Sequence, residues 1–259
     1  MEGNMRGLQS KVAVVTGAGS GIGRAIAQRL AEEGCVVGIF DLSETGGNET
    51  VRLISEAGGR AKAFSVDITN LDAVTRGVQS VEAYAGPIEI LVNNAGWDQA
   101  MPFLNSTPEL WKKVIDINLY GPINMHHAVL TGMAQRKSGR VINIASDAGR
   151  VGSSGESVYS ACKGGVIAFT KTLSRELARN NIQINTVCPG PTDTPLFRSF
   201  AADADAGAKL IESLTRAIPM RRLGQPTDYP GIVAFLASDD AAFITGQTIS
   251  VSGGLTMHG

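Results

Sequence analysis

The sequence is poor in the residues that build metal centres and disulfide scaffolds. Its 259 residues include only three cysteines and three histidines. The cysteines, Cys35, Cys162 and Cys188, are odd in number and form no C-x-x-C pair, which favours reduced thiols over a disulfide framework. The histidines offer no ligand pair, because His126 and His127 are neighbours that would point about 100° apart on a helix. We therefore expect no protein-bound metal.

Excess charge of one sign and long apolar runs are also missing. Lysine and arginine number 23 against 24 aspartates and glutamates, a net charge of −1, so there is no basic footprint for nucleic acid or an anionic membrane. No apolar run approaches the roughly 18 residues needed to span a bilayer. The first six residues lack the apolar core of a signal peptide. We expect a cytoplasmic protein without nucleic-acid or membrane partners.

What is present is an alternation of strand and helix patterns. Hydrophobic residues make up 43% of the chain, enough for a sizeable core. Strands are expected at 11–16, 35–40, 61–66, 88–93, 140–145, 182–187 and 248–251. Helices are expected at 22–33, 44–57, 71–85, 108–134, 157–179 and 227–237. The pattern predicts an α/β fold, a single Rossmann-type domain over 1–259 whose doubly wound parallel sheet has about seven strands and helices on both faces. Residues 191–225 form an excursion that we expect to act as a substrate lid.

A glycine-rich loop follows the first strand. Residues 17–23 read Gly-Ala-Gly-Ser-Gly-Ile-Gly between a strand and a helix, which suits a pyrophosphate held by backbone N–H groups at a helix N-terminus. The spacing is neither the G-x-G-x-x-G fingerprint nor a P-loop. The alternative interpretation is an ordinary glycine-rich turn.

An acidic residue ends the second strand. Asp41 follows the last glycine of the loop by 18 residues, where a carboxylate accepts hydrogen bonds from ribose hydroxyls and repels a 2′-phosphate. The next residue is Leu42 rather than arginine, and no basic residue precedes Gly21 in the loop. These features predict NAD rather than NADP. The alternative is that Asp41 caps the next helix, although Ser43 could serve as that cap.

Three polar residues carry the predicted chemistry. Tyr159 and Lys163 are four apart, so a helix places them on one face, and Ser146 ends the fifth strand. A phenol has a pKa near 10, and lowering it by about 3 units requires roughly 4 kcal/mol. A cation about 4 Å away supplies about that amount at an effective dielectric of 20. Lys163 can be that cation; the alternatives are a surface Tyr/Lys pair and a strand-ending serine that acts as a cap.

With these motifs the chain resembles the short-chain dehydrogenases/reductases from Lys11 to Gly254. The motifs include Thr16-Gly-x-x-x-Gly-Ile-Gly23, Asn93-Asn-Ala-Gly96, Tyr159-x-x-x-Lys163 and Pro189-Gly190. The resemblance implies that Tyr159 is the acid/base, Ser146 positions the substrate oxygen, Lys163 binds the nicotinamide ribose and Asn118 holds a water in a proton relay. The remaining implied cofactor contacts are Thr16, Gly17, Ser20, Gly21, Ile22, Gly23, Asp41, Leu42, Asp67, Ile68, Asn94, Ala95, Gly96, Pro189, Gly190, Thr192 and Thr194. It also implies a homotetramer paired through helices 108–134 and 157–179.

Further stretches are similar to the 2-hydroxycyclohexanecarboxyl-CoA dehydrogenases. They include Trp97-Asp98, Arg150-Val-Gly-Ser-Ser-Gly-Glu156 and Cys188-Pro-Gly-Pro-Thr-Asp-Thr194. This similarity implies an EC 1.1.1-type, NAD-dependent secondary alcohol dehydrogenase of aromatic degradation that acts on a cyclic alcohol or ketone carried as a CoA thioester. The expected pocket residues are Trp97, Ser146, Tyr159, Leu196 and Phe197. The alternatives are a 1-arylethanol or cyclohexanol dehydrogenase, a 3-oxoacyl reductase, and, from another class, a non-catalytic dinucleotide sensor.

Overall fold

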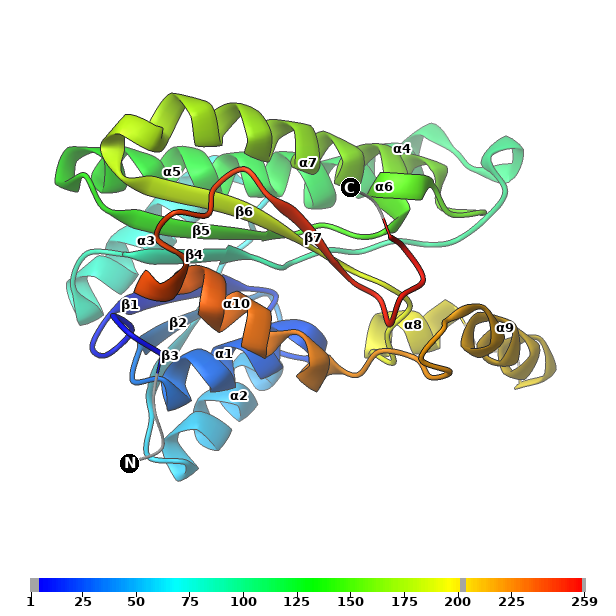
Figure 1. Ribbon diagram of the computed structural model, residues 1–259, viewed down its shortest axis with the longest axis horizontal. Helices are drawn as coiled ribbons and strands as arrows, with labels where there is room; N and C mark the ends of the chain where they lie inside the picture. Colours follow the sequence, from blue (N-terminus) through cyan, green and yellow to red (C-terminus); the bar gives the residue numbers. More distant parts are fainter. Residues whose placement is uncertain (1–4, 201–203, 258–259) are drawn as a thin grey trace.

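The structure, a computed structural model, describes residues 5–200 and 204–257. A seven-stranded sheet with strand order β3-β2-β1-β4-β5-β6-β7 forms its centre, and every neighbouring pair of strands is parallel. The order reverses between β1 and β4, the switch point at which doubly wound sheets bind ligands. The single-domain Rossmann-type prediction is confirmed (Figure 1).

The strands lie within a residue or two of their predicted ranges. They are β1 (Val12–Thr16), β2 (Val36–Asp41), β3 (Arg60–Ser65), β4 (Ile90–Asn93), β5 (Gly139–Ile144), β6 (Ile182–Pro189) and β7 (Thr248–Val251). The helices are α1 (Gly21–Glu32), α2 (Glu44–Glu56), α3 (Leu71–Ala85), α4 (Pro108–Ile115), α5 (Gly121–Arg136), α6 (Ala148–Val151), α7 (Ser157–Leu177), α8 (Pro195–Phe200), α9 (Ala204–Ala217) and α10 (Pro230–Ala237). The four-residue helix α6 falls in a stretch that the sequence predicted to be a loop.

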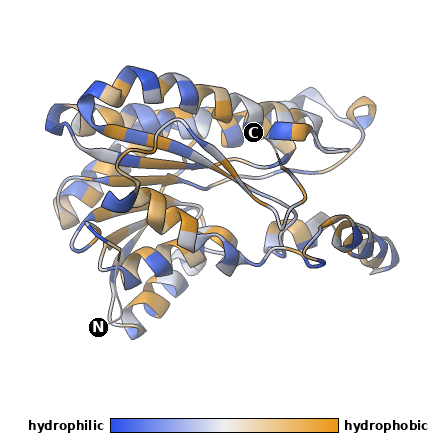
Figure 2. Ribbon diagram, viewed as in Figure 1, coloured by the Kyte–Doolittle hydropathy of each residue, from blue (hydrophilic) through white to orange (hydrophobic). Residues whose placement is uncertain are grey.

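Alternate residues of the central strands point to opposite faces of the sheet. In β1, Ala13 and Val15 pack with α1, α2 and α10, whereas Val12 and Val14 pack with α3, α5 and α7. Full burial of a valine stabilises the fold by about 1.5–3 kcal/mol relative to exposure, so a β-branched run is favoured where both faces are covered. The helices keep hydrophilic residues on their outer faces (Figures 1 and 2).

The helix predicted over 108–134 differs from the prediction. It begins as expected, with Thr107 capping Leu110 N and Pro108 at the first helical position. Residues 116–120 then form a π-helical turn between α4 and α5. Such turns insert one extra residue and cluster at functional sites. Asn118 lies in this turn, which the hydrophobic pattern alone does not reveal.

The excursion over 191–225 is an arm with a closed neck. Helices α8 and α9 project from the body of the molecule (Figure 1), and residues 201–203 between them lie outside the described residues. At the neck, Asp193 N donates to Gly224 O and Gly224 N donates to Pro191 O, each over 2.9 Å. The predicted helix 227–237 is shorter at its start, because a 3₁₀ turn over Pro226–Asp228 precedes α10.

Candidate active site

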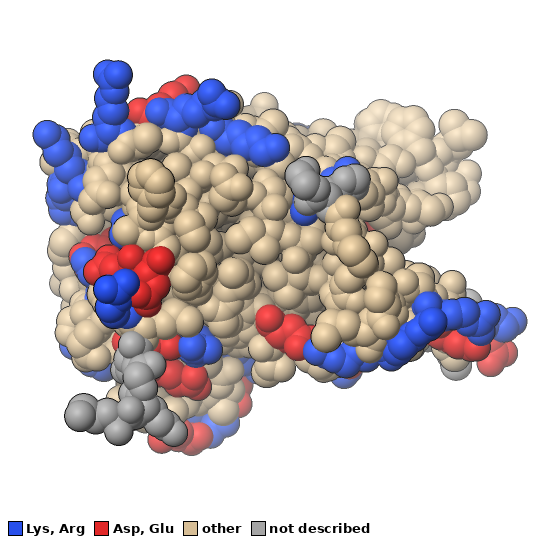
Figure 3. Space-filling view, in the orientation of Figure 1, with Lys and Arg blue, Asp and Glu red and all other residues tan. Residues whose placement is uncertain are grey.

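A cavity of about 1450 Å³ opens at the carboxyl ends of the strands. The space-filling view shows the molecule notched beside the projecting arm (Figure 3). Most of the predicted site residues line the cavity although they come from every part of the chain. They are Gly17, Ser20, Gly21, Ile22, Asp41, Leu42, Asp67, Ile68, Asn94, Ala95, Gly96, Trp97, Ser146, Tyr159, Lys163, Pro189, Gly190, Thr192, Thr194, Leu196 and Phe197.

The glycine loop has the geometry of a dinucleotide cradle. Gly17 and Gly21 adopt φ values of +64° and +53°, the left-handed region that favours glycine. A Cβ on Gly17 would lie 2.8 Å from Ala95 Cα, and one on Gly23 would collide with the Gly17 carbonyl oxygen. The glycine loop therefore packs closely against the loop that follows β4. Helix α1 begins at Gly21, which lines the cavity. These residues fit the pyrophosphate of a nicotinamide dinucleotide.

Asp41 supports the loop and faces the cavity at once. Its Oδ2 accepts a 2.7 Å hydrogen bond from Gly19 N, and its Oδ1 accepts one of 2.8 Å from Ser43 N. Ser43, not Asp41, caps α2, since Ser43 Oγ accepts from Gly46 N. The basic residues that line the cavity, within the described ranges, are Lys113 and Lys163. Arg24 lies outside this lining and binds Gly19 O and Thr50 Oγ1.

Ser146, Tyr159 and Lys163 meet beside this loop. Tyr159 and Lys163 occupy one face of α7, with Lys163 Nζ 5.4 Å from the centre of the Tyr159 ring. Lys163 is 3% exposed, and its Nζ donates a 3.0 Å bond to Ile144 O. Ser146, just after β5, shares a side-chain hydrogen bond with Tyr159 that acts to lower the phenol pKa. The three groups can together hold a substrate oxygen.

Burial controls the proton affinities of this group. It raises the pKa of Tyr159 well above the ordinary phenol value, and the Glu156 and Asp98 charges raise it further. Burial lowers the pKa of Lys163 to about 8. Without a bound ligand, the phenol is therefore neutral at physiological pH and Lys163 is mostly protonated. Positive charge brought next to Tyr159 favours the phenolate.

Three predicted residues act from behind the cavity wall. Thr16 Oγ1 accepts 3.0 Å hydrogen bonds from Asn94 N and Ala95 N, which fixes the loop after β4. Gly23 packs under the glycine loop. Asn118 Nδ2 donates to Trp97 O over 2.6 Å and to Val114 O over 2.9 Å. Thr16 and Gly23 thus support the loops that line the cavity, and their cofactor contacts stay a prediction.

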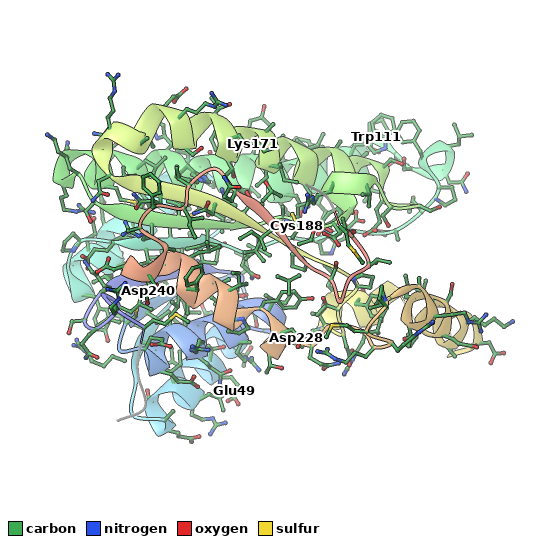
Figure 4. All side chains as sticks on the ribbon, viewed as in Figure 1. Glu49, Trp111, Lys171, Cys188, Asp228 and Asp240 are labelled. Atoms are coloured by element: carbon green, nitrogen blue, oxygen red, sulfur yellow. The ribbon has the colours of Figure 1, made fainter. Side chains whose placement is uncertain are left out.

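Thr192 is in the lining, but its hydroxyl is engaged elsewhere. It donates to Gly190 O over 2.7 Å and lies in a short hydrogen bond with Tyr229 OH. The side chain therefore fixes the neck of the arm, and the cofactor contact of Thr192 stays a prediction. Cys162, between Tyr159 and Lys163, is buried, and Cys188 packs with Ala145 and Val166 near the end of β6 (Figure 4). Burial raises the pKa of Cys188 to about 12, so this thiol stays protonated.

The substrate end of the cavity has apolar walls. Trp97 lines it, and Lys113 Nζ lies 3.6 Å above the centre of its ring. The arm contributes Leu196, Phe197 and two residues of α9, Leu210 and Leu214. The other tryptophan, Trp111, is outside this lining and stacks on Phe103 at the outer end of α4 (Figure 4). The predicted pocket residues therefore all line the same cavity.

Sequence reasoning missed several polar residues of the cavity. Asp98, Asp147 and Glu156 all line it. Asp147 accepts a short hydrogen bond from Ser250 Oγ, and Arg150 donates to the same hydroxyl over 2.8 Å. The signal that could have found them is that Asp98 and Asp147 lie in the loops that follow β4 and β5, at the sheet edge where the ligand is expected. No cluster of three or more potential metal ligands occurs in the parts of the chain that the structure describes. Across those same parts, no helix is both long and apolar enough to cross a membrane.

Comparison with known proteins identifies the family. A family model described as enoyl-(acyl carrier protein) reductase matches residues 17–256. The acetoacetyl-CoA reductase of Shinella zoogloeoides is 41% identical over 245 residues, 95% of this chain and 98% of the relative. The human (3R)-3-hydroxyacyl-CoA dehydrogenase is 39% identical and covers 96% of this chain and 97% of the relative.

A solved structure agrees with these relatives. A single-substitution variant of actinorhodin polyketide ketoreductase with NADPH has a TM-score of 0.92 and 37% identity, over 98% of this chain and 100% of that one. The chain therefore belongs to the short-chain dehydrogenase/reductase family and is an oxidoreductase that acts on a CH–OH group. Membership favours the enzyme over the non-catalytic sensor.

Proposed function

We propose that the protein is an NAD(H)-dependent oxidoreductase that interconverts 3-hydroxyacyl and 3-oxoacyl thioesters. The observation that carries this proposal is the meeting of Ser146, Tyr159 and Lys163 in the same cavity as the glycine loop and Asp41. One end of that cavity suits a dinucleotide and the other has apolar walls. The proton-transferring groups stand between them.

The reaction follows from the chemistry of these side chains. When bound, the nicotinamide ring donates or accepts the hydride. In the reductive direction, Tyr159 donates its phenolic proton to the carbonyl oxygen, and Ser146 holds that oxygen with its hydroxyl. Lys163 provides the positive charge that stabilises the phenolate left behind. In the oxidative direction, the phenolate removes the hydroxyl proton.

The preference for NAD is supported by Asp41. Its carboxylate stands where the second strand meets the cavity, and Leu42, 67% exposed, follows it. A 2′-phosphate would meet a negative charge there, and the two lysines of the lining belong to the Tyr159 and Trp97 region. Ribose hydroxyls can instead donate hydrogen bonds to the carboxylate.

The substrate class is supported by the relatives. Their names include acetoacetyl-CoA reductase, (3R)-3-hydroxyacyl-CoA dehydrogenase and 3-oxoacyl-[acyl-carrier-protein] reductase. These names favour the 3-oxoacyl alternative over an arylethanol or cyclohexanol dehydrogenase. The narrower interpretation, a 2-hydroxycyclohexanecarboxyl thioester, belongs to the same class, because its hydroxyl is also on the carbon β to the thioester carbonyl.

A substrate panel tests the proposal. Rates of NADH formation would be compared for (R)-3-hydroxybutyryl-CoA, 2-hydroxycyclohexanecarboxyl-CoA, 1-phenylethanol and cyclohexanol. We expect kcat/KM for at least one thioester to exceed that for both simple alcohols by 100-fold or more. A simple alcohol that equals the better thioester would overturn the substrate class and leave the oxidoreductase assignment intact.

A further inference from the structure

Two loops bring a pair of carboxyl groups to the substrate end of the cavity. Asp98 lies in the loop after β4, and Glu156 directly precedes α7, one turn before Tyr159. The loops are joined where Met101 N donates a 2.8 Å hydrogen bond to Gly155 O. Gly155 has a φ of +84°, a conformation that favours glycine and turns the chain towards Glu156. Both carboxyl groups line the cavity that holds Tyr159.

Burial makes it costly for Asp98 to carry a charge beside the half-buried Glu156. Asp98 is 6% exposed, and its Oδ2 is buried without a hydrogen-bond partner. A side-chain hydrogen bond joins Asp98 to Glu156, which requires that one of the two carboxyls carry a proton. Burial and the Glu156 charge raise the pKa of Asp98 to about 6. Well above pH 6 Asp98 is ionised, and its negative charge adds to that of Glu156 in the cavity lining.

Acidic side chains outnumber basic ones in this part of the described lining. The two lysines keep their positive charge but are held by other groups: Lys163 Nζ donates to Ile144 O, and Lys113 Nζ lies over the Trp97 ring. Asp147 adds a third acidic group to the same region of the cavity. A substrate with a free carboxylate on the carbon next to its reacting carbon would meet like charge in this region.

We propose that Asp98 and Glu156 are specificity-determining residues, which admit substrates that carry an uncharged ester or thioester group on the carbon next to the reacting carbon and reject the corresponding free carboxylates. The negative charge of the two carboxylates repels a carboxylate on the substrate and does not oppose an uncharged ester or thioester carbonyl. This inference rests on the proposed acyl-thioester function and gives a physical reason for it. The selectivity therefore comes mainly from weaker binding of the free acid, which like-charge repulsion disfavours.

The test compares two substrates that share a ring and differ in charge. Ethyl 2-hydroxycyclohexanecarboxylate and the free 2-hydroxycyclohexanecarboxylate would be assayed with NAD⁺ at pH 8. We expect wild type to prefer the ester in kcat/KM by at least 100-fold. Asp98→Asn and Glu156→Gln, which keep the shape and remove charge, should each narrow this ratio by tenfold or more.

The ratio isolates selectivity from chemistry. Both carboxyls also raise the pKa of Tyr159, so each variant is expected to change absolute rates, but this change applies to ester and acid alike and cancels in the ratio. Glu82→Gln is the matched control, because it removes one exposed charge on α3 outside the cavity lining. Its ratio should equal that of wild type. Thermal melting and NADH binding check that each variant is folded.

A binding measurement tests the same selectivity if the ester and the acid are turned over too slowly to compare. Ethyl cyclohexanecarboxylate and cyclohexanecarboxylate would be titrated into the NADH-bound protein, with the ester expected to bind at least tenfold more tightly. Equal affinities, equal kcat/KM in wild type, or an unchanged ratio in both folded variants would overturn the inference. An enzyme that prefers the ester but turns over no acyl thioester would instead contradict the proposed function alone.

Discussion

At the scale of single residues, the site depends on side chains that serve two purposes. Asp41 accepts hydrogen bonds from the glycine loop and lines the cavity, so its charge shapes the cradle and faces the ligand. Lys163 is buried and bonded to β5 while its charge stands beside Tyr159. Substitutions here change both architecture and chemistry, so the conservative variants are the informative ones.

Tyr159→Phe removes only the transferable proton. We expect kcat to fall by at least about 10²–10⁴-fold, the range of general acid–base catalysis, while NADH still binds. Steady-state rates combined with titration of bound NADH fluorescence measure both effects. A variant that keeps kcat within tenfold of wild type would rule out Tyr159 as the acid/base.

Asp41→Asn removes a charge and keeps the side-chain shape. Wild type is expected to prefer NAD⁺ over NADP⁺ by at least tenfold in kcat/KM, because the carboxylate repels the 2′-phosphate. The variant should narrow that preference, mainly through a lower KM for NADP⁺. Equal use of the two cofactors by wild type would refute the NAD prediction.

At the scale of elements, the arm projects from the body of the molecule and is joined to it at its neck (Figure 1). Its neck is closed by Asp193 and Gly224, and a Cβ at Gly224 would collide with Tyr229 OH. Beyond the neck, α9 exposes Leu210 and Ile211 by 37% and 40%. Leu210 and Leu214 nevertheless line the cavity. We propose that the arm is a lid that closes over cofactor and substrate and excludes water.

Amide hydrogen exchange tests the lid. NAD⁺ and an unreactive substrate analogue should slow exchange across the described part of 195–215, because closure orders α8 and α9. The reference is α3, which lies outside the cavity and should exchange equally in both states. Equal protection of the arm with and without ligands would mean a fixed wall.

At the scale of the whole molecule, a buried polar network crosses the packing between the sheet and the α5–α7 layer. His126 is 1% exposed, with its Nδ1 2.7 Å from Pro122 O and its Nε2 3.3 Å from Asn143 Nδ2. Asn143 also donates to Thr170 Oγ1. Burial lowers the pKa of His126 to about 4 from 6.5. The ring is therefore neutral in the folded protein at physiological pH.

This neutral histidine makes stability depend on pH. His126 is protonated below about pH 6.5 in the unfolded chain but only near pH 4 in the folded chain. Between these values the unfolded state binds more protons, so the stability of the fold decreases as the pH is lowered. From pH 7 to pH 5, this group should cost about 2 kcal/mol. Urea unfolding of wild type and His126→Gln measures it. A variant that loses as much stability as wild type over this range would contradict the assignment.

Assembly is the second prediction at this scale. The resemblance implies a homotetramer paired through α4–α5 and α7, so the protein should elute with about four times its 27.1 kDa chain mass. Phe243 and Leu104, fully and 94% exposed, show that apolar side chains remain on the isolated chain. Light scattering coupled to size exclusion measures the mass. A monomer at micromolar concentration would exclude the tetramer.

The sequence predicted the fold well because buried parallel strands read as short β-branched runs, and their ends fixed which residues share an edge. Thr107-Pro108 and Ser43 marked helix starts correctly. The sequence did not predict the π turn at Asn118, because one inserted residue barely disturbs a helical pattern. The Asp98–Glu156 pair also escaped prediction, because its contact depends on two loops that are distant in sequence and joined through backbone atoms.

The closed neck has a consequence for exchange of parts between relatives. The bonds between 191–193 and 224 join backbone atoms, so they do not depend on which side chains the arm carries. An arm from another member of the family could therefore be grafted between these two points without a change in β6 or the glycine loop. Such a chimaera should inherit the donor's choice of alcohol and retain this chain's affinity for dinucleotide. The fold thus assigns the choice of substrate to the arm and the binding of the dinucleotide to the glycine loop and its strands.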